Sequence, residues 1–549
     1  MTMALLMLTL TACGEKEAAP TKATTAATTV VTTVTTVTTS EPTGDGGVMT
    51  TLSTTGEGCT GTTTALGSTP TKGSTSKPIS TTIVTKPTAS STSTTKTTTA
   101  TEAEPVEYKE GLFTYTVEGG KATITASETV TGGALNVPQA LGGYPVTTIG
   151  NRAFAKHTEI KSVVLPEGVT NLATAAFSGC TFLQKVTFPS TLVKANNKAF
   201  ADCPAIKEVH IGDLSAWCEI EFGADANPLY NGGALYLGGT KVAGAVTVPN
   251  GTKSIAVGAF YQNADITAVA IPASVGSIGA NAFYGCTALK SVTMGDGVTA
   301  IGKSAFSGCK LLDSLTLSKK LVTIGAEAFR DCKELWTLDF PASVKEVGAG
   351  AFEMCTKLKT VNITDLAAWC RTNFYIDSLK SANPTYRSNG TLYLNGTAVE
   401  GRVVVPASTG KVGEGVFYGY DDITEVVFAE GITAIGGYVF PSCTGLSKVT
   451  IPSTVKSIGS CTFYDCDALQ EIVIPDSVTE IGWSTFYLSD GLSTVTLGKG
   501  LKEIGGAAFK SCTVLSKVKY RGSEADRAKI KIGSENEKLT GATWEYNVK

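Results

Sequence analysis

The stretch Ile278–Val298, IGANAFYGCTALKSVTMGDGV, returns thirteen times along the chain in varied form. Its marker is a phenylalanine, found at Phe154, Phe177, Phe200, Phe260, Phe283, Phe306, Phe329, Phe352, Phe417, Phe440, Phe463, Phe486 and Phe509. Successive markers are 23 residues apart, except for steps of 60 after Phe200 and 65 after Phe352. A fixed period of roughly 20 to 50 residues indicates a solenoid, in which each unit packs only on its neighbours.

The unit reads Ile-Gly-x-x-Ala-Phe-x-x-Cys-x-x-Leu-x-x-Val-x-Ile-Pro-x-x-Val. Apolar residues alternate in Leu-x-x-Val-x-Ile, which predicts a strand that the proline ends. Val-x-x-Ile-Gly predicts a second short extended run, whose glycine allows a close backbone approach. Ala-Phe-x-x-Cys-x-x-Leu has the spacing of a helical or 3₁₀ turn. We therefore predict a mostly β solenoid of stacked parallel strands, with one such turn per coil.

This unit resembles the BspA-type leucine-rich repeats of bacterial surface proteins. The matching residues are those of frames such as Ile301-Gly302, Ala305-Phe306, Cys309 and Leu312. The resemblance covers about residues 106–549. It implies a leucine-rich-repeat solenoid and a binding or adhesion role at the cell surface, without identifying a ligand.

Most of the cysteines occupy one position of the repeat, three residues after the phenylalanine. They are Cys180, Cys203, Cys286, Cys309, Cys332, Cys355, Cys443, Cys466 and Cys512. Unpaired cysteine is among the most buried residue types, so we predict nine buried thiols in a packing slot. Disulfides between adjacent coils are an alternative. A zinc site is less favoured, because the sequence has no Cys-x-x-Cys or Cys/His cluster.

The chain begins with a short apolar segment followed by Leu10-Thr11-Ala12-Cys13. This resembles a bacterial lipoprotein signal, although no Lys or Arg precedes the apolar core. We predict a signal peptide over residues 1–12 and a lipid on Cys13. Residues 13–105 are rich in threonine and poor in large apolar residues, which is typical of a disordered stalk.

The remaining boundaries follow from the repeat. We predict an amino-terminal β cap over residues 106–148, the solenoid over 149–520 and a closing cap over 521–549. The two wide steps hold related inserts, near 212–249 and 364–406. Asp213 and Asp365 are suited to cap a short helix in each insert. Gly238-Gly239 and Asn395-Gly396 are suited to hairpin turns.

The inserts supply the first set of candidate binding residues. Loops on a rigid scaffold often bind ligands, so we expect the inserts to project from the array. The candidates are Trp217, Tyr230, Tyr236, Trp369, Tyr386 and Tyr393. The alternative is that each tryptophan packs onto the coil beneath it. We also expect residues 224–240 and 381–397 to be replaceable without loss of the fold.

A second candidate is the position directly after the phenylalanine, which is tyrosine in five coils, including Tyr418. The candidate residues are Tyr261, Tyr284, Tyr464 and Tyr487, which would stack in pairs on neighbouring coils. These residues form either an aromatic ridge for a glycan or partner protein, or tyrosines half-buried on a turn. The exposed position of the main strand is small and almost uncharged in most coils, and it lacks the aromatic anchors of protein hot spots.

No chemistry-bearing motif emerges. Net charge is −3 with 17% charged residues and no basic stripe, which argues against nucleic acid. The only histidines, His157 and His210, lie in no catalytic motif. We predict no catalysis, cofactor or metal. The favoured role is a lipid-anchored protein on the outer face of a bacterial cell that binds an extracellular protein or glycan. The alternatives are a glycan-binding module and a structural surface-layer component.

The lipid anchor gives a direct prediction. Globomycin blocks cleavage of lipoprotein signals, so it should leave an uncleaved precursor of this chain. Cys13→Ser should release the protein from the membrane fraction, as measured by fractionation. A Cys13→Ser protein held as tightly as the wild type would contradict the anchor.

Overall fold

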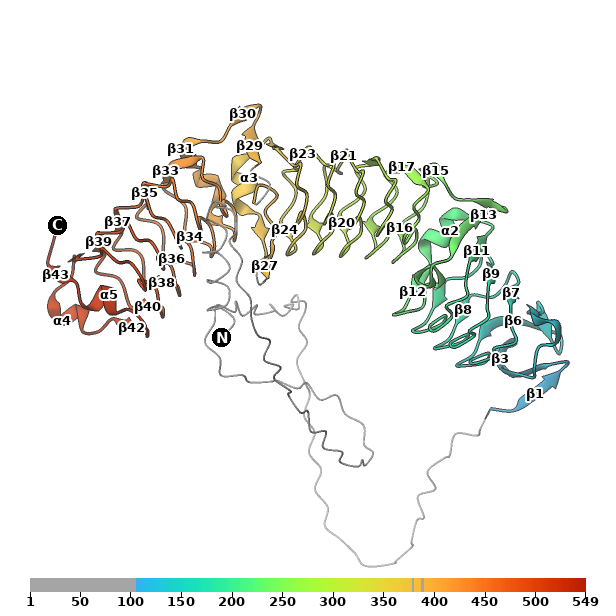
Figure 1. Ribbon diagram of the computed structural model, residues 1–549. Helices are drawn as coiled ribbons and strands as arrows, with labels where there is room; N and C mark the ends of the chain where they lie inside the picture. Colours follow the sequence, from blue (N-terminus) through green and yellow to red (C-terminus); the bar gives the residue numbers. More distant parts are fainter. Residues whose placement is uncertain (1–104, 378–379, 387–389) are drawn as a thin grey trace, which may run out of the picture. The chain divides into compact units, whose positions relative to one another are not determined.

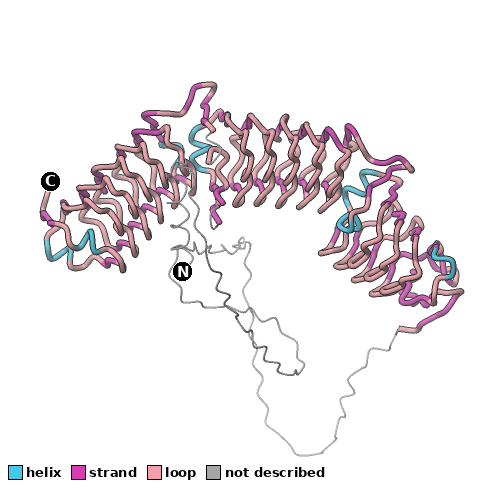
Figure 2. The backbone as a smooth tube through the Cα atoms, viewed as in Figure 1, coloured by secondary structure: helices cyan, strands magenta, loops and turns pink. Residues whose placement is uncertain are grey.

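The structure, a computed structural model, describes residues 105–377, 380–386 and 390–549. They form a β-solenoid of about 18 turns of stacked parallel strands, with few helical residues (Figures 1 and 2). The predicted fold class is therefore confirmed. The predicted signal peptide, Cys13 and the stalk lie outside the described residues.

Each coil has three sides, which we call the first wall, the second wall and the phenylalanine turn. The first wall is built from the Leu-x-x-Val-x-Ile segments. Its strands are β4 (Ala134–Asn136), β7 (Ser162–Val164), β9 (Lys185–Phe188), β11 (Glu208–Ile211), β13 (Ala234–Leu237), β15 (Gly244–Thr247), β17 (Ile266–Ile271), β19 (Ser291–Met294), β21 (Ser314–Thr316), β23 (Thr337–Asp339), β25 (Thr360–Ile363), β29 (Thr391–Leu394), β31 (Gly401–Val405), β33 (Ile423–Phe428), β35 (Lys448–Thr450), β37 (Glu471–Ile474), β39 (Thr494–Leu497), β41 (Lys517–Tyr520) and β43 (Thr543–Tyr546).

The second wall is built from the Val-x-x-Ile-Gly segments, which pair in parallel from coil to coil. Its strands are β3 (Lys121–Ser127), β6 (Tyr144–Ile149), β8 (Asn171–Leu172), β10 (Lys194–Ala195), β12 (Glu221–Phe222), β16 (Ser254–Ile255), β18 (Ser277–Ile278), β20 (Ala300–Ile301), β22 (Thr323–Ile324), β24 (Glu346–Val347), β26 (Asn373–Phe374), β32 (Lys411–Val412), β34 (Ala434–Ile435), β36 (Ser457–Ile458), β38 (Glu480–Ile481), β40 (Glu503–Ile504) and β42 (Lys531–Ile532). In the described part of the chain, this pairing breaks between β12 and β16 and between β26 and β32.

The other elements lie in the caps and inserts. They are β1 (Glu107–Glu110), β2 (Phe113–Glu118), β5 (Ala140–Leu141), β14 (Thr240–Lys241), β27 (Ile376–Asp377), β28 (Lys380–Ser381), β30 (Thr397–Ala398), α2 (Leu214–Glu219), α3 (Leu366–Arg371), α4 (Glu524–Arg527), α5 (Glu537–Thr540), and the 3₁₀ turns η1 (Thr131–Gly133), η2 (Pro228–Asn231) and η3 (Ala407–Thr409).

The core is a column of stacked phenylalanine rings. The two inserts divide the phenylalanine coils into three blocks, with marker residues Phe154 to Phe200, Phe260 to Phe352 and Phe417 to Phe509. Within each block, neighbouring marker rings lie nearly parallel, as for Phe283 and Phe306 with centroids 5.0 Å apart and Phe306 and Phe329 at 5.3 Å. These three rings are fully buried. A ring can be covered on both faces only by the coils before and after it, so the core exists only in the stack.

The phenylalanine turn differs from the helical or 3₁₀ turn that the sequence predicts. Its i→i−3 hydrogen bonds are those of a 3₁₀ turn, for example Tyr284 N–H to Asn281 O at 3.0 Å. However, the residues two before and two after every marker phenylalanine have positive φ, as at Asn281 (55°) and Gly285 (68°). The alternate N–H groups therefore point along the solenoid, and Phe283 N–H donates to Ala305 O at 2.7 Å. The segment is a series of β-turns that forms a third coil-to-coil hydrogen-bond ladder.

The cysteine slot has a hydrogen-bonding function as well as a packing one. Each slot cysteine donates its Sγ–H to the carbonyl of the phenylalanine in the preceding coil, as from Cys309 to Phe283 at 3.2 Å. Ser489 fills the same slot and donates to Phe463 O at 2.8 Å. All twelve described cysteines are buried thiols. The prediction of buried thiols in the slot is thus confirmed.

The slot changes at the first coil of each block, where the preceding coil has no marker phenylalanine. His157 is bonded to Glu159 at 2.7 Å. Asn263 donates to Val242 O at 2.9 Å, and the Tyr420 hydroxyl accepts Leu392 N–H at 3.0 Å. At the second and third block starts the slot residue therefore pairs with a backbone group of the preceding coil, whereas His157 pairs with Glu159 of its own coil.

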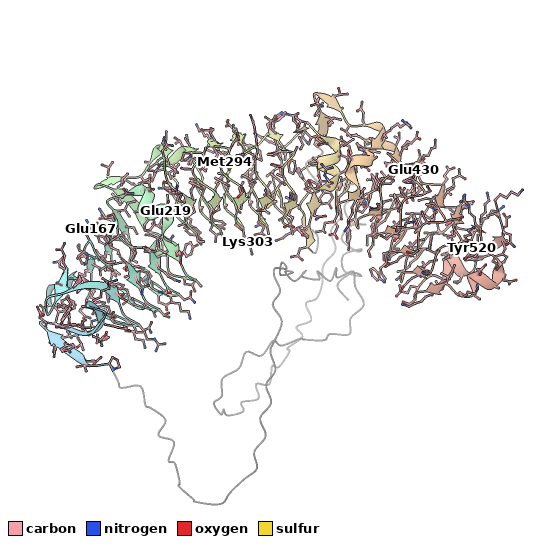
Figure 3. All side chains as sticks on the ribbon, turned by 180° about the vertical axis from the view of Figure 1, so that it is seen from behind. Glu167, Glu219, Met294, Lys303, Glu430 and Tyr520 are labelled. Carbon is pink, nitrogen blue, oxygen red and sulfur yellow. The ribbon has the colours of Figure 1, made fainter. Side chains whose placement is uncertain are left out.

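Further contacts lock the coils in register. A Cβ on Gly302 would lie 2.5 Å from Ala280 N of the preceding coil, which explains the glycine of the Ile-Gly pair. Acidic side chains also bridge coils, and two of them are labelled in Figure 3. Glu167 accepts from Ser190 N and Oγ, both at 2.9 Å. Glu430 accepts from Ser453 in the same way.

The caps and inserts turn out to be coils themselves. In the first insert, β12 pairs with β10 and β13 pairs with β11. In the second, β26 pairs with β24 and β29 with β25. The closing cap adds β42 and β43 to the two walls. The array is therefore longer than its thirteen phenylalanine coils, and its last strand, β43, lies within the predicted closing cap.

The buried thiols predict a loss of stability in alkali. Burial raises the pKa of the Cys218, Cys286 and Cys512 thiols to about 12. Unfolded thiols ionise near pH 8.5, so each contributes stability that is present below that pH and is lost as pH rises towards 12, at about 1.4 kcal/mol per pH unit. Urea unfolding between pH 8 and 10.5 measures this.

The variant Cys286→Ala isolates the effect from the other groups that titrate in alkali. Its free energy of unfolding should fall less steeply with pH than that of the wild type. Equal slopes for the two proteins would contradict the assignment.

Candidate functional site

The two insert tryptophans are structural. Trp217 and Trp369 are each 1% exposed. The Trp217 indole N–H donates to Ala259 O at 2.8 Å, and that of Trp369 donates to Val416 O at 3.2 Å. In a regular coil this carbonyl, directly before the phenylalanine, accepts from the phenylalanine N–H of the preceding coil. Each tryptophan thus replaces that donor at the start of a block, and neither can contact a ligand.

A buried asparagine completes each junction. Asn227 donates to the carbonyls of Val257 and Gly258 at 3.1 and 3.0 Å. Asn383 donates to those of Gly415 and Val416 at 2.9 and 2.7 Å. The expectation that residues 224–240 and 381–397 are replaceable loops is therefore wrong, because they satisfy the first carbonyls of the next block.

The hairpin tips of the inserts are exposed, as expected. Gly238 and Gly239 join β13 to β14, and Asn395 and Gly396 join β29 to β30, all with positive φ. The predicted helix caps are also present, since Asp213 accepts from Ala216 N and Asp365 from Ala368 N. Tyr236 and Tyr393 lie half-buried on the outer face of the first wall, and Tyr236 stacks on His210 at 4.7 Å.

The structure brings together insert and stripe tyrosines that the sequence separates. Tyr230 contacts Tyr261 edge to face at 4.7 Å, and Tyr261 stacks on Tyr284 at 5.2 Å. Tyr386 packs in the same way against Tyr418 at 4.5 Å. All of these rings are half-buried. They cover the phenylalanine turns at the block starts, so the packing interpretation accounts for them.

The second half of the tyrosine stripe is buried. Tyr464 and Tyr487 are 8% and 7% exposed, and they meet edge to face at 5.6 Å. The Lys510 ammonium lies 5.5 Å from the centre of the Tyr487 ring. The stripe therefore does not form a continuous accessible ridge.

The outer face of the first wall differs between blocks. In the outer blocks its charged residues pair across coils, as in Lys185 with Glu208 at 3.5 Å. Glu425 contacts both Arg402 and Lys448, at 3.5 and 3.1 Å. In the middle block the same column holds hydroxyl residues, namely Ser291, Ser314, Thr337, Thr360 and Thr391.

The first wall is also interrupted at two places within blocks. Among the described residues no strand pairing joins β21 to β23, or β35 to β37. A hollow of about 700 Å³ lies over the second interruption. Polar side chains such as Ser447, Gln470 and Glu471 line it, together with Val449 and Ile472. Its volume is in the range of small-molecule sites, about 300 to 1,000 Å³.

The first interruption carries a residue that the sequence analysis missed. Trp336, directly before β23, is 56% exposed. The sequence singles out Trp336 when the repeats are aligned. The residue seven after the phenylalanine is polar in all the other phenylalanine coils. Trp336 is thus an exposed aromatic side chain for which the repeat gives no packing reason, as is Phe182, 59% exposed, in the first block.

The described residues contain no group of three or more His, Cys, Asp or Glu side chains able to hold a metal ion. They also contain no helix with the length and apolar character of a membrane span.

Comparisons with known proteins agree with the fold. A family model described as a BspA-type leucine-rich repeat region, in six copies, matches residues 144–219, 253–380 and 402–525. A leucine-rich repeat protein from Bacteroides ovatus is 21% identical, with 80% of this chain and 100% of that chain covered and a TM-score of 0.44. A leucine-rich cell surface protein from Faecalibacterium prausnitzii is 23% identical, with 78% and 98% covered and a TM-score of 0.37.

The pneumococcal vaccine antigen PcpA is 16% identical, with 81% of this chain and 97% of that chain covered and a TM-score of 0.32. A comparison with curated protein sequences finds no match.

The junction geometry makes a stability prediction. Trp217→Phe keeps a buried ring but removes the donor to Ala259 O, so it should destabilise the fold by about 1–3 kcal/mol in urea unfolding. Trp336→Phe at an exposed position is the matched control and should change stability by less than about 0.5 kcal/mol. Equal effects of the two substitutions would show that the indole donor is dispensable.

Proposed function

This chain belongs to the BspA-type leucine-rich-repeat family, and from that premise we propose that it is a non-catalytic cell-surface protein whose solenoid binds an extracellular macromolecule. Leucine-rich-repeat proteins generally bind macromolecular partners, and the surface-protein family suggests binding or adhesion. The description of a structural neighbour as a cell surface protein suggests an extracellular location. No catalytic family is indicated.

The observation that carries the proposal is the outer face of the first wall. Its strands hold one outward-facing residue per coil in register over many coils, as in Val164↔Thr187. The stacked rings, the thiol ladder and the phenylalanine-turn ladder fix each coil against the next. A preorganised surface loses little conformational entropy on binding, which favours recognition of a large partner.

Attachment to the membrane forms the second part of the proposal. The lipobox-like Leu10-Thr11-Ala12-Cys13 supports a lipid on Cys13, and the threonine-rich residues 13–105 support a stalk between lipid and solenoid. A flexible chain of this length would span roughly 50 Å between its ends. Such a stalk would hold the first wall away from the membrane.

Two other functions remain as rivals. A structural surface-layer component would need the solenoid only as a rigid body, with no ligand of its own. A glycan-binding module would need accessible aromatic side chains beside hydrogen-bonding groups. Trp336 in the middle block favours the glycan-binding module over the structural surface-layer component.

The proposal is tested with the full chain on cells and in purified form. Cells carrying the gene should adhere better than a deletion strain to at least one surface in a panel of matrix proteins and polysaccharides. The purified chain should bind the same surface saturably. External protease should remove the solenoid from intact cells. Equal adhesion of both strains, together with no binding by the purified chain, would favour the structural role instead.

A further inference from the structure

Trp336 is the exception in an otherwise polar column of the solenoid. The equivalent residues of the other coils are Lys161, Gln184, Lys207, Thr267, Lys290, Asp313, Lys359, Thr424, Ser447, Gln470, Ser493 and Ser516. The Trp336 backbone is fixed, because its carbonyl accepts the N–H groups of Lys359 and Thr360 at 3.0 and 3.2 Å. The indole is therefore a large apolar surface presented to solvent from a rigid strand end. Exposed tryptophan on a rigid element is typical of binding sites.

The surface beside Trp336 is rich in hydroxyl groups, and the charged side chains nearest to it in the same column, Asp313 and Lys359, are of opposite sign. The residues that directly follow the Trp336 column form a column of hydroxyl side chains. They are Ser291, Ser314, Thr337, Thr360 and, in the insert coil, Thr391. The next outward column holds Thr293, Thr316, Asp339 and Asn362, and Asn362 donates to Asp339 at 2.8 Å. In the outer blocks the first of these columns instead carries ion pairs such as Lys185 with Glu208 and Lys448 with Glu425. The middle block alone combines an exposed indole with rows of hydroxyl donors and acceptors.

The backbone is also opened at this place. β21 and β23 are not paired with each other, although the second wall is continuous across the same coils through β20, β22 and β24. The rings of Phe306 and Phe329 remain stacked at 5.3 Å. The opening is therefore confined to the first wall beside Trp336, where the facing strand edges add backbone N–H and C=O groups to the surface.

We propose that this face of the middle block binds a neutral linear polysaccharide that runs across the coils, with the Trp336 indole stacked on one sugar ring. A sugar ring has an apolar C–H face and a polar hydroxyl rim, which match the indole and the hydroxyl columns. The coils repeat at about 4.8 Å, a spacing close to the length of one pyranose unit, so successive sugars meet equivalent hydroxyl groups. A protein partner would instead require a cluster of aromatic anchors, and this face offers a single one.

This inference deepens the proposed binding function and rests on it. The probes are soluble neutral polysaccharides, namely a β-1,3-glucan, a β-1,4-xylan and a mannan, with heparin as the anionic comparison. Affinity electrophoresis of the full chain in gels containing each probe measures binding. We expect at least one neutral polysaccharide, and not heparin, to retard the protein.

Three variants locate the site. Trp336→Ala should weaken binding of the retarding polysaccharide by about tenfold or more, and Trp336→Phe should weaken it less, because phenylalanine keeps part of the stacking surface. Phe182→Ala is the matched control, since Phe182 is 59% exposed in another block, and it should bind like the wild type. Unchanged thermal unfolding of the variants verifies their fold.

Two results would overturn the inference. The first is that no neutral polysaccharide retards the wild type. The second is that Trp336→Ala binds as tightly as the wild type. If Trp336→Ala instead weakens binding to a matrix protein, this face is a protein interface and the carbohydrate assignment is wrong, while the proposed binding function stands. That function fails only if the full chain binds neither proteins nor polysaccharides.

Discussion

The structure depends on coupling between successive coils. No coil encloses a core of its own, because the marker ring of each coil, such as Phe306, is covered by the rings of Phe283 and Phe329. A regular step such as that from Phe283 to Phe306 is also bridged by two backbone ladders on the walls, a third on the phenylalanine turn and a thiol bond from the slot. Apolar contact and hydrogen bonding thus act across the same interface, and the shape of a coil is maintained by its neighbours.

This coupling explains features that appear irregular along the chain. The slot is cysteine only where the preceding coil presents a phenylalanine carbonyl, and it becomes His157, Asn263 or Tyr420 at the block starts. Likewise, the indole of Trp217 supplies the hydrogen bond that a phenylalanine N–H makes elsewhere. The departures from the repeat are therefore substitutions that keep the junction groups paired, as buried polar groups require.

The sequence predicts the structural features that repeat in every coil. It does not predict contacts between a single residue and a coil far away in the chain. The phenylalanine spacing was sufficient for the solenoid, its parallel strands and the buried slot. It could not predict that Trp217 bonds a carbonyl 42 residues away, so the inserts resembled loops. The positive φ of residues such as Ser304 and Glu327 also had no signal, because side chains of many kinds occupy that position. Trp336 was detectable, but only by comparing one column across all coils.

The constant step of 23 residues has a consequence for how such a gene can change. Recombination between two repeats that removes or adds a whole unit joins coils whose rings, slot and ladders are already matched. Inside a block, such an event alters the length of the array without creating a new kind of interface. A unit lost next to an insert would instead separate Trp217 or Trp369 from its acceptor carbonyl. Length variation should therefore be tolerated within blocks and selected against at the junctions.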